Sequence, residues 1–342
     1  MGLSPQAGEG HSSPVEVAVV GSYVQDLAFA TDRFPSAGET RIGSFRTGAG
    51  GKGFNQAVAC NRQGVKTLFI GAIGDDIFGR EVVEFARKDG LYAEFEVVHG
   101  QSSGAAAVLV NRQAQNQIVV ALGANSSLSS EHIDRFGERI SKAKVIVVQL
   151  ESNLKATQRA LQIGRHSGVI TILNPAPINP DVTEKFFRLA DIATPNETEF
   201  RFLIERVIKE EIEEDFWTRS AEDLQRLCLK LSIPTLVLTL GERGAFISHN
   251  HAAKEKIQTA YEILDVEPFY FLPALKVSCV DTTGAGDAFN GGLAAGMVKY
   301  PKSFSAAASY ATVVASLSTT RQGTAQAMPS MQEVASKLPG FA

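Results

Sequence analysis

Residues 280–297 read VDTTGAGDAFNGGLAAGM, and this stretch restricts the fold and the chemistry more than any other part of the chain. Three small residues, Gly284, Ala285 and Gly286, stand directly before Asp287 and an apolar run that predicts a helix. Backbone N–H groups at a helix N-terminus favour developing negative charge. An aspartate there can take a proton from a hydroxyl nucleophile. The combination suits phosphoryl transfer to an alcohol, although Asp287 could instead simply cap the helix.

A second glycine-rich stretch, TGAGGKGFNQ at residues 47–56, contains G-x-G-x-x-G and a Gly-Lys pair. A phosphate-binding loop is excluded, because that motif needs glycine where Arg46 stands and Ser or Thr where Gly53 stands. A dinucleotide fingerprint would follow a buried strand, but the upstream TRIGSFRT is half polar; Asp75, after the next strand, keeps this alternative open. The remaining interpretation is a cradle for hydroxyls or an anion, built from Gly48, Gly50, Gly51, Lys52, Gly53 and Asn55.

Six apolar runs are typical of strands buried on both faces. They are VEVAVV (15–20), VKTLFIGAIG (65–74), KVIVVQL (144–150), VITILNPAP (169–177), DIATPN (191–196) and PTLVLTL (234–240). Helical patterns lie between them, and two of these end at Gly64 and Gly90. Repeated strand–helix units predict an α/β fold with a central, mostly parallel sheet flanked by helices.

Two segments interrupt this alternation of strands and helices. Residues 27–47 are short, alternating and rich in turn residues, and residues 104–123 read as a hairpin around NRQAQN. Together they predict a small antiparallel lid sheet that closes over a site or pairs with another subunit. The alternative is a pair of surface hairpins.

Composition restricts the partners and the compartment. The chain has 342 residues, 44% of them hydrophobic, and a formal net charge of −4. This balance gives no reason to expect nucleic acid or a membrane surface as a partner, and no apolar run is long enough to span a bilayer. Three scattered cysteines, Cys60, Cys228 and Cys279, indicate a reduced, cytoplasmic setting. We expect residues 1–14 to be a disordered tail and residues 15–342 to form one domain.

The two glycine-rich stretches also carry a family resemblance. DTTGAGDAF resembles the C-terminal signature of the ribokinase-like (PfkB) sugar and nucleoside kinases, and GAGGKGFNQA resembles their N-terminal signature. Further similar pieces are GSYVQD, PSAGET, VVQLES, NPAP, TPNETE, TLGERG and TTRQG. The resemblance covers about residues 15–335 and implies a Rossmann-like three-layer α/β fold with a small lid sheet.

This resemblance implies a role for individual residues. Asp287 would be the catalytic base, with the transferring γ-phosphate held by the amides of Gly284, Ala285 and Gly286. The sugar would be bound by Asp26, Gly51, Lys52, Asn55, Glu151 and Asp287. The nucleotide would be bound by Asn196, Thr239, Gly241, Gly244 and Gly286. Read from the residues alone, Glu151 could be a capping carboxylate and Asp26 a turn residue.

The resemblance also implies two cations. Glu199, in NETE, would organise Mg²⁺ through water, although NETE could be only a helix cap with an acidic first turn. A monovalent cation, K⁺, would be held, mostly by backbone carbonyls, at Asp281, Thr283, Ser318, Arg321 and Gly323. The last position of this loop falls near Ala327, which has no hydroxyl to offer.

The chain departs from the family pattern in three places. Val24 stands where the family has the asparagine of N-x-D, so one amide contact to the sugar is missing. Residues 248–271 form a longer connection than usual, with an aromatic cluster that would cover the adenine side, an oligomer face or its own domain. FRFLIERVIKEE replaces a short turn and predicts an altered surface helix.

The activity implied by the resemblance is ATP-dependent phosphorylation of the 5-hydroxyl of D-ribose, giving ribose 5-phosphate, with Mg²⁺ and K⁺. Because of Val24, a kinase of the same mechanism for another pentose, a ketohexose or a nucleoside remains an alternative. Alternatives of other classes are a catalytically silent sugar-binding or regulatory protein on this fold and a dinucleotide oxidoreductase. Residues 27–47 resemble the clasp that pairs two subunits in this family, so we expect a homodimer.

Overall fold

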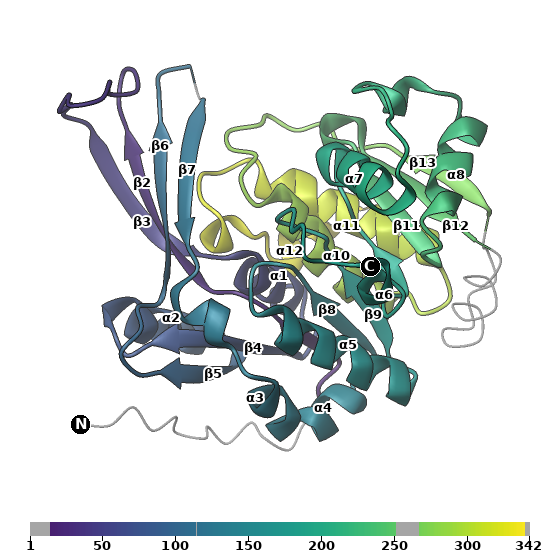
Figure 1. Cartoon of the computed structure of the whole chain (residues 1–342), viewed down its shortest axis with the longest axis horizontal. Helices are drawn as coiled ribbons and strands as arrows, with labels where there is room; N and C mark the ends of the chain where they lie inside the picture. The colour runs from purple at the N-terminus through teal and green to yellow at the C-terminus, as the bar shows by residue number, and fades with distance from the viewer. Residues whose placement is uncertain (1–13, 114, 251–266, 339–342) are drawn as a thin grey trace.

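The computed structural model describes residues 14–113, 115–250 and 267–338, and its main feature is a nine-stranded sheet (Figure 1). The strands lie in the order β13-β12-β11-β10-β9-β8-β1-β4-β5. Their bounds are Val17–Val20 (β1), Thr67–Gly74 (β4), Tyr92–Val98 (β5), Val145–Val148 (β8), Ile170–Leu173 (β9), Ile192–Ala193 (β10), Thr235–Thr239 (β11), Ala245–His249 (β12) and Phe269–Leu272 (β13). Each neighbouring pair of strands from β11 to β5 is parallel, whereas β12 pairs antiparallel with both β11 and β13. The prediction of six buried strands in a mostly parallel sheet is confirmed.

Helices cover both faces of the sheet, so the fold has three layers (Figure 1). Side chains alternate along β1: Val17 and Val19 belong to one buried apolar cluster, and Ala18 and Val20 belong to the other. The helices of the first face are α1 (Lys52–Asn61), α2 (Ile77–Lys88), α10 (Ala285–Lys299), α11 (Phe304–Ser318) and α12 (Met331–Ala335). Those of the second face are α3 (Ser130–Arg135), α4 (Gly137–Ser141), α5 (Leu154–Ser167), α6 (Glu184–Phe187), α7 (Glu197–Leu203) and α8 (Ala221–Lys230). Burial on both faces explains why the strands read as continuous apolar runs.

Helix α10 packs closely against both α1 and α11 because glycines stand on two of its sides. A Cβ at Gly291 would lie 2.4 Å from Gln56 O, and a Cβ at Gly296 would lie 2.6 Å from Ala307 O. Close-packed interiors cannot absorb such overlaps without moving a helix. The small residues that follow Asp287 in the sequence therefore set the spacing of three helices.

The lid sheet has the strand order β3-β2-β6-β7 and stands away from the body of the protein (Figure 1). Its strands are β2 (Val24–Ala30), β3 (Ser44–Gly50), β6 (Gly104–Val110) and β7 (Asn116–Ala121). The predicted small sheet is confirmed, with one correction: the central pair, β2 and β6, is parallel. Both strands continue from the carboxyl ends of parallel strands, β1 and β5, so they leave the main sheet in the same direction.

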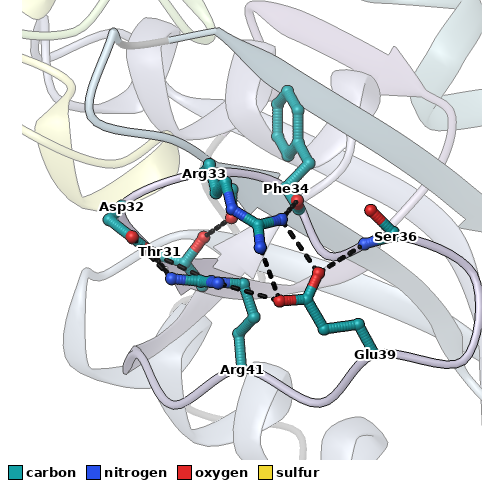
Figure 2. Close-up of polar contacts among 7 residues, drawn as sticks. All are labelled: Thr31, Asp32, Arg33, Phe34, Ser36, Glu39 and Arg41. Atoms are coloured by element: carbon teal, nitrogen blue, oxygen red, sulfur yellow. Dashed lines mark hydrogen bonds and ion pairs between the residues drawn. The ribbon is translucent and has the colours of Figure 1, made fainter.

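The turn between β2 and β3, at the tip of the lid, is held by an ion-pair network (Figure 2). Arg33 binds both carboxylate oxygens of Glu39, at 2.7 and 2.8 Å, and Arg41 bridges Glu39 and Asp32. Hydrogen bonds from Arg33, from the backbone of Ser36 and from Arg41 lower the pKa of Glu39 to about 2. Exposed pairs of this kind add little stability, so their effect is to give a long turn one defined shape.

Three predicted features of the surface have different outcomes. The altered helix after NETE is present as α7, which continues as a π-helical turn over Ile204–Ile208. Most of the predicted tail, residues 1–13, and residues 251–266 of the long connection lie outside the described residues. Within the described part of the chain, no helix is both long and apolar enough to cross a membrane.

Candidate active site

Asp287 lies where the N-terminal turns of α1 and α10 meet, and it is only 7% exposed. Its Oδ2 accepts a hydrogen bond from Asn55 Nδ2 at 2.9 Å, and its Oδ1 accepts one from Gln56 Nε2 at 3.0 Å. Two neutral donors thus fix the orientation of the carboxylate, and its remaining lone pairs can still accept a proton. The two glycine-rich stretches, more than 200 residues apart in the sequence, therefore build one site.

The turn before α10 leaves room for an anion. Gly284 is the N-cap of α10 and has φ 78°, a left-handed conformation that glycine adopts without strain. A Cβ at Gly286 would meet nothing within 4 Å, so open space lies beside the first turn of the helix. The Ala285 N–H donates to Thr282 O at 3.1 Å, so this one of the three expected amides is already engaged within the turn. First-turn N–H groups and the helix dipole make the opening favourable for negative charge.

Polar groups suited to hydroxyls lie beside this opening, at the start of α1. Glu151 is 8% exposed, and its Oε2 accepts hydrogen bonds from Ser22 Oγ at 2.5 Å and from the Lys52 N–H at 2.8 Å. Asn55 Oδ1 is buried and has no hydrogen-bond partner in the described part of the chain. A buried acceptor without a partner is costly, so this oxygen fits a ligand hydroxyl.

Burial and nearby negative charge together shift the pKa values of Asp26 and Lys52 in this region. Burial raises the pKa of Asp26 to about 6; the Thr324 hydrogen bond opposes this, and the charges of Glu151 and Asp287 add to it. Burial alone would lower the pKa of Lys52, but the charges of Asp287 and Glu151 outweigh it and the pKa is raised. Lys52 is therefore a protonated cation among carboxylates, as binding of an anionic group requires.

The second glycine-rich stretch makes room for protein as well as for a ligand. A Cβ at Gly50 would lie 2.4 Å from Asp26 Oδ2, and a Cβ at Gly53 would lie 2.7 Å from Gly21 Cα. Gly51, the N-cap of α1, has φ 89°. The sequence predicts that these glycines let the backbone approach a ligand closely. The structure adds that Gly50, in the lid strand β3, makes room for the Asp26 side chain of the neighbouring strand β2, and that Gly53 lets the end of β1 reach the start of α1.

Four of the five residues expected on the nucleotide side lie around the ends of β10 and β11, and the fifth, Gly286, lies on α10. Asn196 and Glu199 form a capping box at the start of α7, each accepting the other's backbone N–H, at 2.8 and 2.9 Å. Thr239 forms an isolated parallel bridge with Asn196, and Gly241 and Gly244 follow with φ of 55° and 96°. Burial raises the pKa of Glu199. The helix cap that the sequence offered as an alternative is therefore present, beside a cluster of the residues expected to bind the nucleotide.

The residues expected around a monovalent cation are only partly brought together. Asp281 Oδ1 accepts the Thr283 N–H at 3.0 Å, and its Oδ2 accepts the Gly323 N–H at 3.2 Å, so one carboxylate joins two loops. The side chains of Ser318 and Arg321 bind elsewhere, to the backbone of α11 and to Glu333. A cation at these positions would therefore be held mainly by backbone carbonyls.

Comparison with known proteins agrees with this geometry. The model of the pfkB family of carbohydrate kinases matches residues 15–331. The chain belongs to this family. It is 35% identical to a ribokinase of Mus musculus over 288 residues, which cover 83% of this chain and 82% of the mouse protein. It is 33% identical to a deoxyribokinase of Salmonella typhi over 321 residues, covering 93% of this chain and 97% of that enzyme.

Solved structures of ribokinases have the same fold. The ribokinase of Giardia lamblia has a TM-score of 0.81 and 28% identity, covering 95% of this chain and all of that one. An Arabidopsis thaliana ribokinase complexed with ribose and ATP has a TM-score of 0.79 and 26% identity, covering 95% of this chain and 98% of that one. Together with the family match, these comparisons identify the protein as an ATP-dependent carbohydrate kinase.

Three residues of this candidate site were missed by sequence reasoning. Gln56 binds Asp287, Ser22 binds Glu151, and Thr324 Oγ lies 2.9 Å from Asp26 Oδ2. Gln56 could have been noticed, because it directly follows Asn55 inside the same glycine-rich stretch. Ser22 and Thr324 stand in segments whose residue types are common in ordinary loops, so only the fold reveals them.

We expect the Asp26 carboxyl to titrate near pH 6, because burial outweighs the Thr324 hydrogen bond. Thr324→Val removes that donor and should move the titration midpoint to higher pH. The measurement is ¹³C NMR of the aspartate carboxyl groups, with Asp26→Asn identifying the resonance. Between about pH 4 and 6 the folded protein holds a proton on Asp26 that the unfolded chain releases. The contribution of this group to the free energy of unfolding therefore rises as pH falls through that range. A midpoint near pH 4 in the unaltered protein would contradict the expectation.

Proposed function

We propose that the protein transfers the γ-phosphoryl group of ATP to the 5-hydroxyl of D-ribose, giving ribose 5-phosphate and ADP. The observation that carries the proposal is the Asp287 carboxylate held between Asn55 and Gln56 at the open N-terminal turn of α10. Asp287, the proposed proton acceptor, directly follows the turn that we propose binds the phosphate. The ribokinases among the relatives support ribose as the acceptor.

In the proposed reaction, Asp287 accepts the proton of the sugar's 5-hydroxyl as its oxygen bonds to the γ-phosphorus. The bond between that phosphorus and the β,γ-bridging oxygen breaks, and ADP leaves with the electron pair. The first-turn N–H groups of α10 stabilise the charge that accumulates on the transferring oxygens. Asp26, Glu151 and the unpartnered oxygen of Asn55 hold the remaining hydroxyls of the sugar.

Two cations complete the proposal. No three His, Cys, Asp or Glu side chains gather into a metal site in the described residues, so a magnesium ion would rely on Glu199, water and phosphate oxygens. Mg²⁺ accepts such a ligand set and would neutralise phosphate charge. K⁺ would be held by the loops that Asp281 joins, beside the turn before α10. Carboxylate and carbonyl oxygens of this kind are ligands that such cations accept, which supports the proposal.

A second candidate sugar is 2-deoxy-D-ribose, and the observation that favours it is Val24. Alternation along β2 places Val24 on the same face as Asp26, and Val24 is 2% exposed. An apolar side chain there offers no hydrogen bond to a sugar hydroxyl. A sugar that lacks one hydroxyl therefore loses less catalytic efficiency than it would in a site with an amide at this position. The 33% identity to a deoxyribokinase supports the same candidate.

The first prediction from this proposal concerns the base. Asp287→Asn keeps the shape of the side chain but cannot accept the proton, so kcat should fall by about 10²- to 10⁴-fold. Sugar binding, measured by isothermal titration calorimetry, should stay within a few-fold. Asp75→Asn, a matched change on an exposed carboxylate that pairs with His99, should leave kcat unaltered. Substantial residual turnover by Asp287→Asn would exclude Asp287 as the base.

The second prediction concerns the choice of sugar. Turnover of ATP should be measured with D-ribose, 2-deoxy-D-ribose, D-fructose and adenosine, and kcat/KM should be highest for D-ribose. Val24→Asn adds an amide beside Asp26 and should raise the ratio of kcat/KM for D-ribose over 2-deoxy-D-ribose by about 10-fold. A preference for 2-deoxy-D-ribose in the unaltered protein would establish the second candidate. A preference for fructose or adenosine would overturn both.

We also propose that two copies of the chain pair through their lid sheets. The strand register places Phe29, Phe45 and Val119 on the lid face opposite Asp26, where they are 42%, 55% and 73% exposed. The rings of Phe29 and Phe45 lie side by side, with centroids 4.9 Å apart. Neighbouring exposed apolar side chains of this size are typical of protein contact surfaces.

The dimer can be tested by sedimentation velocity at micromolar concentration. The unaltered protein should sediment as a dimer, and Val119→Asp should sediment as a monomer because it buries a charge in the contact. Val83→Asp is the matched control: Val83 is 41% exposed on α2, which packs against β4 and β5 of the main sheet, and its replacement should leave the dimer intact. A monomeric unaltered protein would refute the pairing.

A further inference from the structure

Beneath Asp287 lies a buried amide that the reaction described above does not use. Gln56 is fully buried, with 0% exposure. Its Nε2 donates to Asp287 Oδ1 at 3.0 Å and to Asn174 Oδ1 at 3.1 Å, and its Oε1 accepts from Gln149 Nε2 at 2.7 Å. Both hydrogens of the amide and its oxygen are therefore engaged. Gln56 has no donor left for a substrate.

The orientation of Gln56 is determined by its neighbours. If its oxygen and nitrogen were exchanged, the oxygen would face two acceptors, the Asp287 carboxylate and Asn174 Oδ1, and the nitrogen would face a donor on Gln149. Asn55, the other donor to Asp287, differs in this respect, because its Oδ1 is buried without a partner. Asn55 is therefore suited to contact a ligand, and Gln56 is suited only to hold Asp287.

The partners of Gln56 come from the rigid carboxyl edge of the sheet. Gln149 directly follows β8, and Asn174 directly follows β9. Asn174 Nδ2 in turn reaches the carbonyl of Thr194, the residue after β10, at 3.3 Å. Strand ends in the centre of a sheet move little, and interlocked buried hydrogen bonds add to this rigidity. Gln56 thus connects the sheet to the carboxylate of Asp287.

The same network continues to the anion-binding turn. Thr194 Oγ donates to Asn290 Oδ1 at 2.7 Å, and Asn290 Nδ2 donates to Gly286 O at 2.9 Å. Thr194 and Asn290 are 2% and 1% exposed, so water does not compete for these bonds. One connected set of buried side chains therefore reaches both Asp287 and Gly286. The base and the phosphate-binding turn are fixed to one common support.

We propose that Gln56 is a positioning residue: together with Gln149 and Asn174 it holds the Asp287 carboxylate in the orientation that accepts the hydroxyl proton. The inference rests on the proposed role of Asp287 as base. Gln56 touches neither sugar nor nucleotide and transfers no proton. Its loss should reduce the rate of the chemical step and leave both substrates bound, because a carboxylate that turns away from the hydroxyl still leaves the binding groups in place.

The test is Gln56→Met, which keeps the length of the side chain and removes its donors. We expect kcat to fall by about 10- to 100-fold, with KM for sugar and for ATP changed by less than about 3-fold. The matched control is Gln63→Met. Gln63 is also 0% exposed, and it makes three hydrogen bonds of its own, to Ala59 O, Pro329 O and Tyr310. Its replacement should lower the melting temperature and leave kcat within about 2-fold.

Each outcome decides something. The positioning role is refuted if the kcat of Gln56→Met equals that of Gln63→Met. It is also refuted if the substitution raises the KM values for sugar and ATP as much as it lowers kcat. Asp287→Asn measured beside it separates the two proposals: an active Asp287→Asn refutes the base itself, whereas an inactive Asp287→Asn with a normal Gln56→Met refutes only the inference. Circular dichroism and melting temperature establish that the variants are folded.

A second variant keeps the test decisive if Gln56→Met does not fold. Gln149→Met removes the donor that holds Gln56 Oε1 without touching Asp287. Gln149 Oε1 is itself buried with no partner among the described residues, so this change also removes a costly unpaired oxygen. We expect kcat to fall by about 3- to 10-fold with unchanged KM values. An unchanged kcat would overturn the proposal.

Discussion

The contact between α1 and α10 is the constraint on which the site depends. Gly291 lets the two helices approach until the first turn of α1 faces the first turn of α10. Only at this spacing can Asn55 and Gln56 both donate to the carboxylate of Asp287. Since both helices point their N-terminal ends at the same place, their dipoles also act on the same charge. A wider spacing would separate the polar groups at the start of α1 from the open turn before α10, and each half alone would be an ordinary helix cap.

The local charges follow from this convergence. Asp26, Glu151 and Asp287 come from the lid, the sheet edge and α10, and the charges of Glu151 and Asp287 help to raise the pKa of Asp26 to about 6. The Lys52 ammonium compensates part of this negative charge; burial alone would lower its pKa, but the charges of Asp287 and Glu151 raise it. Burying several like charges lowers the stability of the fold. Proteins tolerate this cost at sites where the charges bind a ligand or react with it. The cluster is thus itself a sign of a functional site.

Sequence patterns predicted the parts of the structure that local chemistry determines. The six buried strands were recognisable because they are apolar on both faces, and Asp287 because small residues and an apolar run surround it. Edge strands such as β5, whose residues are all partly exposed, lack that signal. The parallel pairing of β2 with β6 was also hidden, because it depends on the direction in which both strands leave the main sheet.

The long-range hydrogen-bond partners of Gln56 and Thr324 could not be predicted for a related reason. Gln56 meets Asp287 across 231 residues of sequence, and Thr324 meets Asp26 across 298. No periodicity or spacing connects residues so far apart, so a buried glutamine and a loop threonine look like any others. The family resemblance supplied the residues that would touch a ligand. It said nothing about the side chains that hold those residues in place, and these emerge only from the packing.

The segment that follows α11 ties the lid to the rest of the site. Thr324 binds Asp26 in the lid, and the adjacent Gly323 N–H binds Asp281, in the loop that leads into the turn before α10. A few residues later, the carbonyl of Met328 accepts a hydrogen bond from Arg62, just beyond α1, at 2.7 Å. One short stretch therefore contacts the lid, the loop that leads into the turn before α10, and the end of α1. The position of the lid and the shape of that turn cannot vary independently, because both are hydrogen-bonded to neighbouring residues of the same backbone.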